Sequence, residues 1–393
     1  MKILFWMFIG FDRHATSEHL LLSVIERLCE EGCSVHILQK DTGGDLPSIP
    51  EKLTKYDVTT DVFPVRAADR GNFVSRYLTE LIYIRDCRKA LVPGYDAVFI
   101  QSTTAAGFAV RAVRKKLPGA LLTLNVQDIF PCNLAYCGRL KKTSPVYKIL
   151  AAEQRFGYKH ADHIITISED MKDTLTAEGV PEGRVEVVYN WSYQDDLYRN
   201  VDLSPVSHMF SPFFFNVVYA GNIGLMQNVD ILLDAAELMK EERDVRFHII
   251  GSGVCKERLE AEAKERGLLN ISFWPMQEPE LAPAVYSAAD VNVIPLVRGV
   301  YRTALPSKTA TCLACQKPVV LAIGKESRFG KKARDEAGCI LVDAERAEEL
   351  AEALRRVRKG DGKGRSGEFF MKYCALTRNS RKYSDIITGR SAR

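Results

Sequence analysis

The residues best suited to chemistry lie where a buried strand passes into a helix in the second half of the chain. After strand-like Val291–Pro295 come Arg298, Gly299, Val300, Tyr301, Arg302 and then Leu305-Pro306-Ser307-Lys308. Proline suits the first turn of a helix, and the free N–H groups of that turn, such as that of Ser307, attract anions. With the charges of Lys308, Arg298 and Arg302, they predict a diphosphate site. The alternative is a basic surface loop capped by Pro306.

Two glycine-containing turns follow strands in the same half of the chain. After Phe215–Ala220 and Val245–Ile250 the turns contain Gly221, Asn222, Gly224, Gly251 and Gly253. Glycine lets backbone N–H groups come close to a phosphate or a sugar. The spacing is not G-x-G-x-x-G, and a purely structural turn explains each of them equally well.

A third strand in this half ends in the segment 273–277, Phe-Trp-Pro-Met-Gln. Gln277 and the aromatic rings beside it are suited to receive the flat edge of a nucleotide base. A core aromatic at the end of a strand is the alternative.

In the first half of the chain, three residues follow strand-like segments. Gly10 and His14 come after the first strand, and Asp128 comes after Ala120–Asn125. An aspartate there can accept a proton or bind sugar hydroxyls, although it can also cap the next turn. His14 is either a catalytic group or a plain loop histidine.

The cysteines do not predict a metal site. Cys312 and Cys315 lie within an apolar helical segment, and Cys132 and Cys137 lack any matching histidine pattern. Ten cysteines without framework spacing favour buried, reduced thiols in a cytoplasmic protein.

These residues need a scaffold of alternating strands and helices. In the first half we expect strands at Lys2–Phe8, Ser34–Leu38, Asp96–Gln101, Ala120–Asn125, His163–Ile167 and Arg184–Tyr189, and helices at Glu18–Glu31, Phe73–Leu91, Ala105–Lys116, Pro145–Lys159 and Asp170–Glu178. Short Val/Ile-rich strands alternating with longer helices indicate βα units and a parallel sheet.

A second series of the same kind follows a looser stretch, 192–212. Its expected strands are Phe215–Ala220, Val245–Ile250, Ile271–Trp274, Val291–Pro295, Pro318–Ala322 and Cys339–Val342. We therefore expect an α/β protein with two Rossmann-like, doubly wound domains facing a cleft, in which ligands bind at the carboxyl ends of the strands. The domains are expected at 1–203 and 204–365, followed by a C-terminal helix or tail at 366–393.

Composition and charge narrow the class further. The chain has 393 residues, is 46% hydrophobic and has a net charge of +4, which excludes disordered, collagen-like and coiled-coil proteins. It lacks the run of about 18–20 apolar residues that crosses a membrane. The apolar N-terminus has no clear cleavage site, so we interpret it as a buried strand.

Residues 101–150 hold eight basic side chains and one acidic residue, Asp128. The region 111–148 is therefore expected to attract anions, such as phosphate or the lipids of the inner membrane face, unless it is an ordinary solvated face. Nucleic acid is disfavoured because aromatic residues do not alternate with these cations as they do on stacking platforms.

Longer segments of the chain resemble retaining glycosyltransferases of family 4, which have the GT-B fold. The similar segments are Val217–Met239, Phe247–Leu296 and Leu305–Ala322 in the second half, and Gln127–Pro131, Ile165–Lys172 and Val187–Trp191 in the first. The resemblance implies that the second domain binds a nucleotide sugar, with Thr311 on the ribose side, and that Asp128 orients the acceptor hydroxyl with His14 beside it.

The chain departs from that family at several positions. Thr303 and Thr311 stand where many members carry two glutamates, and residues 225–228 lack the usual Arg and Lys. The positive charge that binds the phosphates is then expected from Lys308, Arg302 and Arg298.

The resemblance implies sugar transfer from a nucleoside diphosphate sugar to a carbohydrate or polyprenyl-lipid-linked acceptor. It further implies retention of configuration, a role in capsule or exopolysaccharide assembly, and no metal or other cofactor. Two alternatives stay open: a non-catalytic partner subunit and a sugar-nucleotide epimerase of the same fold.

Overall fold

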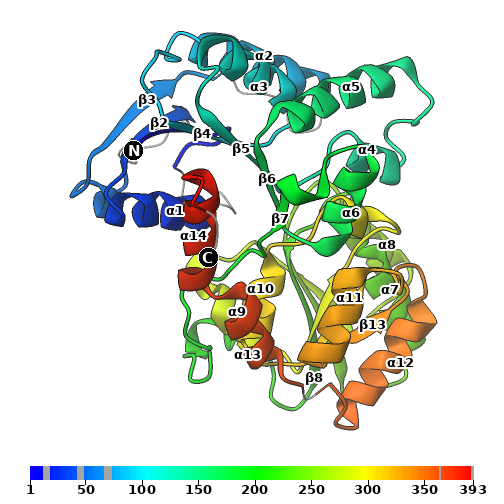
Figure 1. The fold of residues 1–393 in the computed structure, drawn as a ribbon. Coiled ribbons are helices and arrows are strands. Elements are labelled where there is room, and N and C mark those ends of the chain that lie inside the picture. The colour runs from blue at the N-terminus through cyan, green and yellow to red at the C-terminus, as the bar shows by residue number, and fades with distance from the viewer. Residues whose placement is uncertain (12–17, 42–47, 66–72, 363, 391–393) are drawn as a thin grey trace. The chain divides into compact units, whose positions relative to one another are not determined.

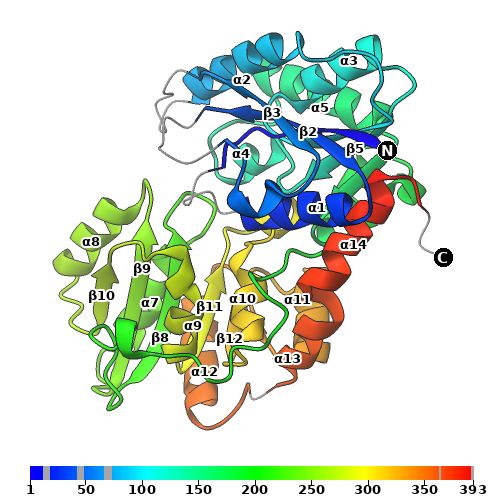
Figure 2. The same cartoon turned by 90° about the vertical axis from the view of Figure 1, so that its left-hand side faces the viewer.

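The computed structural model describes residues 1–11, 18–41, 48–65, 73–362 and 364–390. By its internal contacts the chain forms two compact units, residues 1–193 with 376–393, and residues 194–375. The expected boundaries lay at 203 and 365. Each unit is described separately below, and Figures 1 and 2 show the course of the chain.

The first unit is built on a seven-stranded parallel sheet in the order β3-β2-β1-β4-β5-β6-β7. Its strands are β1 (Lys2–Trp6), β2 (Ser34–Lys40), β3 (Val58–Phe63), β4 (Ala97–Gln101), β5 (Leu121–Val126), β6 (His163–Thr166) and β7 (Val185–Val187). Its helices are α1 (Glu18–Glu30), α2 (Phe73–Cys87), α3 (Ala106–Lys116), α4 (Cys132–Tyr136), α5 (Pro145–His160), α6 (Glu169–Ala177) and α14 (Leu376–Ile387).

The second unit has a six-stranded parallel sheet in the order β10-β9-β8-β11-β12-β13. Its strands are β8 (Phe215–Asn222), β9 (Val245–Ser252), β10 (Ile271–Trp274), β11 (Val291–Pro295), β12 (Val319–Ala322) and β13 (Ile340–Val342). Its helices are α7 (Asp230–Leu238), α8 (Lys256–Glu265), α9 (Ala282–Ala288), α10 (Lys308–Ala314), α11 (Arg328–Lys332), α12 (Ala347–Arg358) and α13 (Ser366–Phe369). This 3-2-1-4-5-6 order confirms the predicted doubly wound fold.

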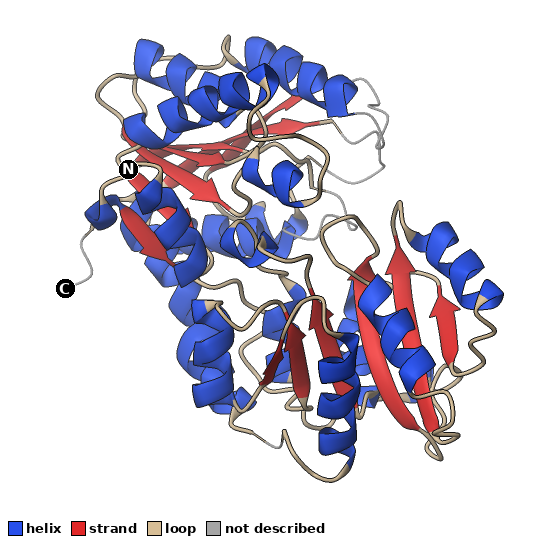
Figure 3. Ribbon diagram, turned by 90° about the vertical axis from the view of Figure 1, so that its right-hand side faces the viewer, coloured by secondary structure: helices blue, strands red, loops and turns tan. Residues whose placement is uncertain are grey.

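Helices cover both faces of each sheet, which explains why the strands are apolar on both sides (Figure 3). In the first unit, β1 is buried from Ile3 to Trp6, and α2, α3 and α5 cover one face of its sheet while α1 and α14 cover the other (Figure 2). Local signals set the helix starts: Ser144 caps α5 by accepting a hydrogen bond from the Tyr147 N–H, and Pro145 occupies the first turn.

Strand β3 and the short helices α4, α11 and α13 lie outside the expected pattern, whereas α14 is the C-terminal helix expected within 366–393. Strand β3 was not expected, because its Val-Thr-Thr-Asp-Val-Phe sequence is half-exposed and lies at the sheet edge beside β2. Helix α14 completes the first unit, where Tyr383 and Ile387 join the core of β1 and α1. Nothing within residues 376–387 signals which sheet they cover.

Candidate functional site

In the second unit, the strand order reverses between β8 and β11, which makes this the topological switch point of the sheet. Strand β8 pairs with β9 as far as Asn222 and Ser252, but with β11 only at Val217 and Val218. From Tyr219 onward, the edge of β8 that faces β11 is therefore not covered by ladder pairing. Such a switch point is the usual binding place in doubly wound sheets.

The amino group of Lys308 lies at this switch point. The Nζ atom is buried, has no hydrogen-bond partner among the residues that the structure describes, and lies 3.7 Å from the centre of the Tyr219 ring. Burial lowers the pKa of Lys308 to about 7, while the Cys312 thiol has a smaller, opposite effect. Lys308 begins α10, which spans only Lys308–Ala314, so the side chain rather than the helix dipole supplies most of the charge here.

Gly221 makes room for this amino group. A Cβ atom at position 221 would lie 2.9 Å from the Lys308 Nζ and 3.2 Å from its Cε, and the backbone φ of 132° also favours glycine. Two of the predicted donor-site residues, Gly221 and Lys308, therefore lie next to each other.

The other predicted glycines allow two backbone segments to touch. A Cβ atom at Gly251 would lie 1.9 Å from the carbonyl oxygen of Gly221, and one at Gly253 would lie 2.3 Å from that of Ile223. A Cβ atom at Gly224 would meet the side chains of Asn222 and Gln227. The close packing of the β8 and β9 turns explains these glycines without a ligand.

Two further contacts brace the same turns. The Ile223 N–H donates to the Ser252 carbonyl at 2.8 Å. The Lys256 ammonium donates to the carbonyl of Gly251 at 3.0 Å and to that of Trp274 at 2.8 Å, which ties the ends of β9 and β10 together. The sequence analysis missed Lys256, although its place in the first turn after a glycine turn was a usable signal.

The two arginines are held by neighbouring side chains. The Arg298 guanidinium forms ion pairs with Asp343 at 3.0 Å and Glu345 at 2.7 Å, and Glu345 is the main cause of its raised pKa. Arg302 donates to the Tyr301 hydroxyl at 3.1 Å. The sequence could not reveal the acidic partners of Arg298, because they follow β13, 45 or more residues along the chain.

The two threonines at the glutamate positions lie inside the fold. Thr303 is fully buried and its hydroxyl donates to the Val300 carbonyl, while Thr311 is 7% exposed. Ser307 is half-buried at the start of α10 and makes no side-chain capping bond.

The predicted base-binding segment after β10 has an internal role as well. The Trp274 indole N–H donates to His248, whose other ring nitrogen lies 3.1 Å from Asn216, and burial lowers the pKa of His248 to about 4. Gln277 is half-buried and donates to the Pro275 carbonyl at 3.0 Å. The indole is thus fixed at the carboxyl end of the sheet by a buried chain of hydrogen bonds.

In the first unit, Asp128 follows β5 at the carboxyl edge of the sheet. The residue is accessible to solvent, yet the protein around it desolvates the carboxyl group and raises its pKa to about 7. Just before it, Gln127 donates to Asn125 at 3.1 Å, and Asn125 accepts from the Tyr383 hydroxyl at 3.0 Å. Gly10 is buried after β1, and His14 lies outside the described residues.

A second polar group at this edge was not expected from the sequence. The Lys40 ammonium, at the end of β2, lies 5.3 Å from the centre of the Tyr83 ring, and desolvation lowers its pKa. Glu80 is buried and accepts a hydrogen bond from the Thr104 hydroxyl. A lysine as the last residue of a buried strand was the signal that could have revealed it.

The basic region contains both structural and exposed side chains. Arg114 pairs with Asp162 at 2.7 Å and Lys116 donates to the Arg88 carbonyl, so both help to hold the first unit together. Arg139, Lys141, Lys142 and Lys148 are exposed.

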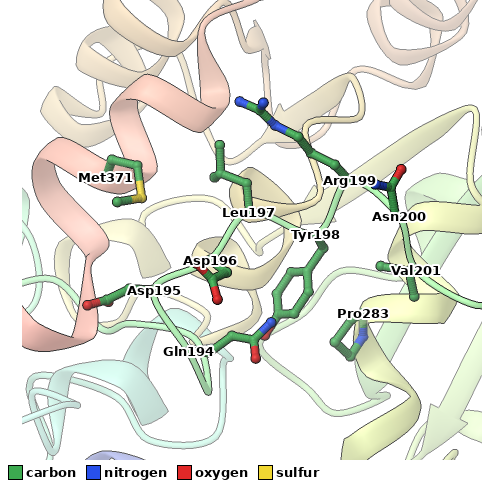
Figure 4. Close-up of a pocket in the computed structure, with 10 residues that line it drawn as sticks. All are labelled: Gln194, Asp195, Asp196, Leu197, Tyr198, Arg199, Asn200, Val201, Pro283 and Met371. Carbon is green, nitrogen blue, oxygen red and sulfur yellow. The ribbon is translucent and has the colours of Figure 1, made fainter.

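One open pocket of about 780 Å³ lies elsewhere on the second unit (Figure 4). It is lined by residues 194–201 with Pro283 and Met371, and none of the predicted site residues borders it. Because Asp195 and Asp196 are on its wall, the pocket is poorly suited to a diphosphate.

The chain matches known families over most of its length. Residues 17–191 match the family described as "Glycosyl transferase 4-like domain", and residues 215–359 match "Glycosyl transferases group 1". The chain carries the two domains of GT-B glycosyltransferases. The coarse prediction is thereby confirmed; retention and family 4 itself remain predictions.

Two curated relatives and one solved structure show the same likeness. WcaI of Escherichia coli (strain K12), named as a colanic acid biosynthesis glycosyl transferase, is 29% identical over 61% of each chain. WbjE of Pseudomonas aeruginosa, named as a glycosyltransferase, is 29% identical over 53% of this chain and 52% of its own length. The alignments thus span between half and two thirds of these relatives. A structure of Anabaena Alr3699/HepE with UDP and glucose aligns over 99% of this chain and 100% of its own, with a TM-score of 0.69 and 15% identity, and supports the fold.

Among the described residues, no helix is both long enough and apolar enough to span a membrane.

Proposed function

We propose that this protein transfers a sugar from a nucleoside diphosphate sugar to a carbohydrate or polyprenyl-lipid-linked acceptor. The observation that carries the proposal is the Lys308 amino group at the switch point of the second sheet, to which no described residue offers a hydrogen-bond acceptor. A cation there meets the charge of a diphosphate leaving group, which increases as the sugar bond breaks. The UDP bound to the structural neighbour supports a nucleotide as the ligand.

The donor site that we propose is smaller than the one expected from the sequence. Lys308 provides the main charge, Arg302 and the Ser307 N–H are its neighbours in sequence, and Gln277 lies after β10 on the base side. Because Arg298 is paired with two carboxylates, we assign it to holding the β11 and β13 turns together. The ribose contact falls to Thr311 or to backbone groups.

On the acceptor side, we propose that Asp128 accepts a hydrogen bond from the attacking hydroxyl. An accessible carboxylate at the end of a central strand is placed for that task. The proposal also includes a role for His14 beside Asp128 and retention of configuration. It further includes a reaction without a metal and a role in capsule or exopolysaccharide assembly. The name of the E. coli relative supports the polysaccharide role.

We also propose peripheral contact with anionic lipids of the inner membrane face through the first unit. Exposed apolar side chains occur in the N-terminal halves of α2, α3 and α5, namely Val74, Leu78, Phe108, Val146 and Ile149. Helices that return from a parallel strand begin at its carboxyl edge, so this apolar rim lies on the same edge as Asp128. The exposed cations at 139–148 are next to it in sequence and complement anionic headgroups.

Vesicle co-sedimentation tests the membrane contact. Charge reversal at Lys141, Lys142 and Lys148 is expected to abolish binding to vesicles that contain phosphatidylglycerol. The matched control reverses Lys240 and Lys264 of the second unit, which are exposed as well. Equal binding by both variants would assign the cations to an ordinary solvated face.

The transferase test combines binding and turnover. We would record saturation-transfer NMR of the protein with UDP-, GDP- and dTDP-sugars and measure nucleotide release with membrane extract. One donor is expected to bind and to release its nucleotide only with acceptor. Lys308→Ala should weaken the binding strongly and abolish the release, while Lys240→Ala retains both. Binding without release would favour a non-catalytic subunit, and interconversion of the sugar would favour an epimerase.

A further inference from the structure

The Lys308 amino group lies in surroundings that suit an amine better than an ammonium ion. Its Nζ atom is buried, and within the described part of the chain no oxygen or nitrogen accepts a hydrogen bond from it. The face of the Tyr219 ring is its closest described aromatic contact, at 3.7 Å. A buried ammonium without acceptors loses more hydration free energy than a single cation–π contact returns.

The neighbouring titratable groups do not compensate for this loss. Tyr219 on β8 has a pKa raised well above its ordinary value by burial, so it is neutral near pH 7. The Cys312 thiol, on α10 itself, is likewise held neutral by burial, so it offers no negative charge to Lys308 near pH 7. No carboxylate faces Lys308 among the described residues, although its own helix packs against α9 and α13.

We propose that Lys308 is partly uncharged in the free protein at pH 7 and largely uncharged at pH 8, and that it takes up a proton when the donor diphosphate binds. The proton comes from solvent: the neutral amine, one hydrogen ion and the diphosphate form an ammonium–diphosphate pair, and no covalent bond changes. This inference rests on the proposed function, since it needs a diphosphate as the ligand. The lowered pKa of Lys308 agrees with it.

A lysine that can lose its proton avoids a buried, unpaired charge in the site when no donor is bound. A permanent buried cation would destabilise the folded protein until a donor arrived, and an arginine cannot lose its proton. A lysine can remain a neutral amine beside Tyr219 and Gly221. It becomes a charged ammonium when the negative diphosphate lies next to it. The proton therefore accompanies the donor into the site.

Isothermal titration calorimetry measures the proton directly. UDP, GDP and dTDP would be titrated into the full chain at pH 8 in two buffers of different ionisation enthalpy, such as HEPES and Tris. With a pKa of about 7, roughly 0.9 proton should be taken up per bound nucleotide. The terminal phosphate, whose pKa is about 6, is already ionised at that pH and cannot account for uptake.

The pH dependence of affinity provides a second readout. The charged fraction of Lys308 falls from about one half at pH 7 to a few per cent at pH 8.5, so Kd should rise by about 15-fold. Lys308→Arg, which keeps the charge, should bind nucleotide without proton uptake and without this rise. If the longer arginine does not fit under Gly221, Lys308→Met should bind weakly and also without uptake.

The outcomes separate this inference from the proposed function. Nucleotide binding with equal heats in both buffers, after correction for the ligand, would overturn the proton uptake and leave the donor site in place. Binding of none of the three nucleotides would overturn both. Equal proton uptake by the wild type and by Lys308→Met would assign the proton to another group and reject Lys308.

Discussion

At position 221, the difference between glycine and alanine is one methyl group placed 2.9 Å from the Lys308 nitrogen. We expect Gly221→Ala to displace the lysine and to weaken nucleotide binding at least tenfold, measured by calorimetry. Gly267→Ala is the matched control: Gly267 also has a positive φ, of 65°, but nothing lies within 4 Å of its added Cβ. Both variants should lose about 1–2 kcal/mol of stability from backbone strain. Equal nucleotide affinity of Gly221→Ala and Gly267→Ala would show that binding does not need the space that Gly221 leaves for Lys308.

The raised pKa of Asp128 predicts that kcat/KM for the acceptor decreases at acidic pH. The carboxylate is the form that can accept the acceptor's proton, and desolvation raises its pKa to about 7. The kcat/KM for acceptor, measured at saturating donor, should therefore fall as the pH drops through 7 and approach tenfold per pH unit below about 6. Asp128→Asn should be slow by about 10²–10⁴-fold and lack that decrease. A flat wild-type profile between pH 5.5 and 8 would contradict the role.

Among the predicted site residues, the sequence predicted a position correctly where that position depends only on one strand and the turn that follows it. Asp128 and the Gly221–Lys308 pair lie at carboxyl ends of strands, as expected. Their detailed roles depend on partners distant in sequence: Arg298 is held by Asp343 and Glu345, and Gly251 is required by the carbonyl of Gly221. No local pattern in the chain records such contacts.

At the scale of elements, Lys256 joins two turns of the proposed donor site. Its ammonium donates hydrogen bonds to the carbonyls of Gly251 and Trp274. Charge-assisted hydrogen bonds of this kind contribute about 1.5–3 kcal/mol each to stability. Lys256→Met should raise the donor KM several-fold with a smaller change in kcat, because the turns lose their fixed positions. Lys264→Met, on the exposed side of the same helix α8, is the control and should match the wild type. A loss confined to kcat would place Lys256 elsewhere in the reaction.

Periodicity predicted the elements themselves because both sheets are parallel and buried on both faces. The Val/Ile-rich strands and the amphipathic helices are therefore easily distinguished. Strand β3 was missed since an edge strand with one half-exposed face lacks that composition. The partner of α14 was missed for another reason: its contacts, such as Asn379 with the Tyr189 carbonyl, join residues 190 positions apart.

At the scale of the whole molecule, α14 returns the chain to the first unit. Tyr383 and Ile387 are buried in the core of β1 and α1, and each fully buried side chain of this size contributes about 1.5–3 kcal/mol. A chain that ends at Ala375 should therefore lose several kcal/mol of stability in the first unit, while residues 194–375 keep theirs. Calorimetric unfolding would show one transition lowered and the other unchanged. Two unchanged transitions would mean that α14 is dispensable.

The return of α14 also sets the order in which the protein is completed during synthesis. Domains generally fold as the ribosome releases them, with the N-terminal one first. Here the second unit is a continuous stretch that ends at Ala375, whereas the first unit lacks one layer of its core until residues 376–387 emerge. The unit that is translated first is therefore finished last, and a nascent chain stalled before α14 carries a complete second unit and an unfinished first one.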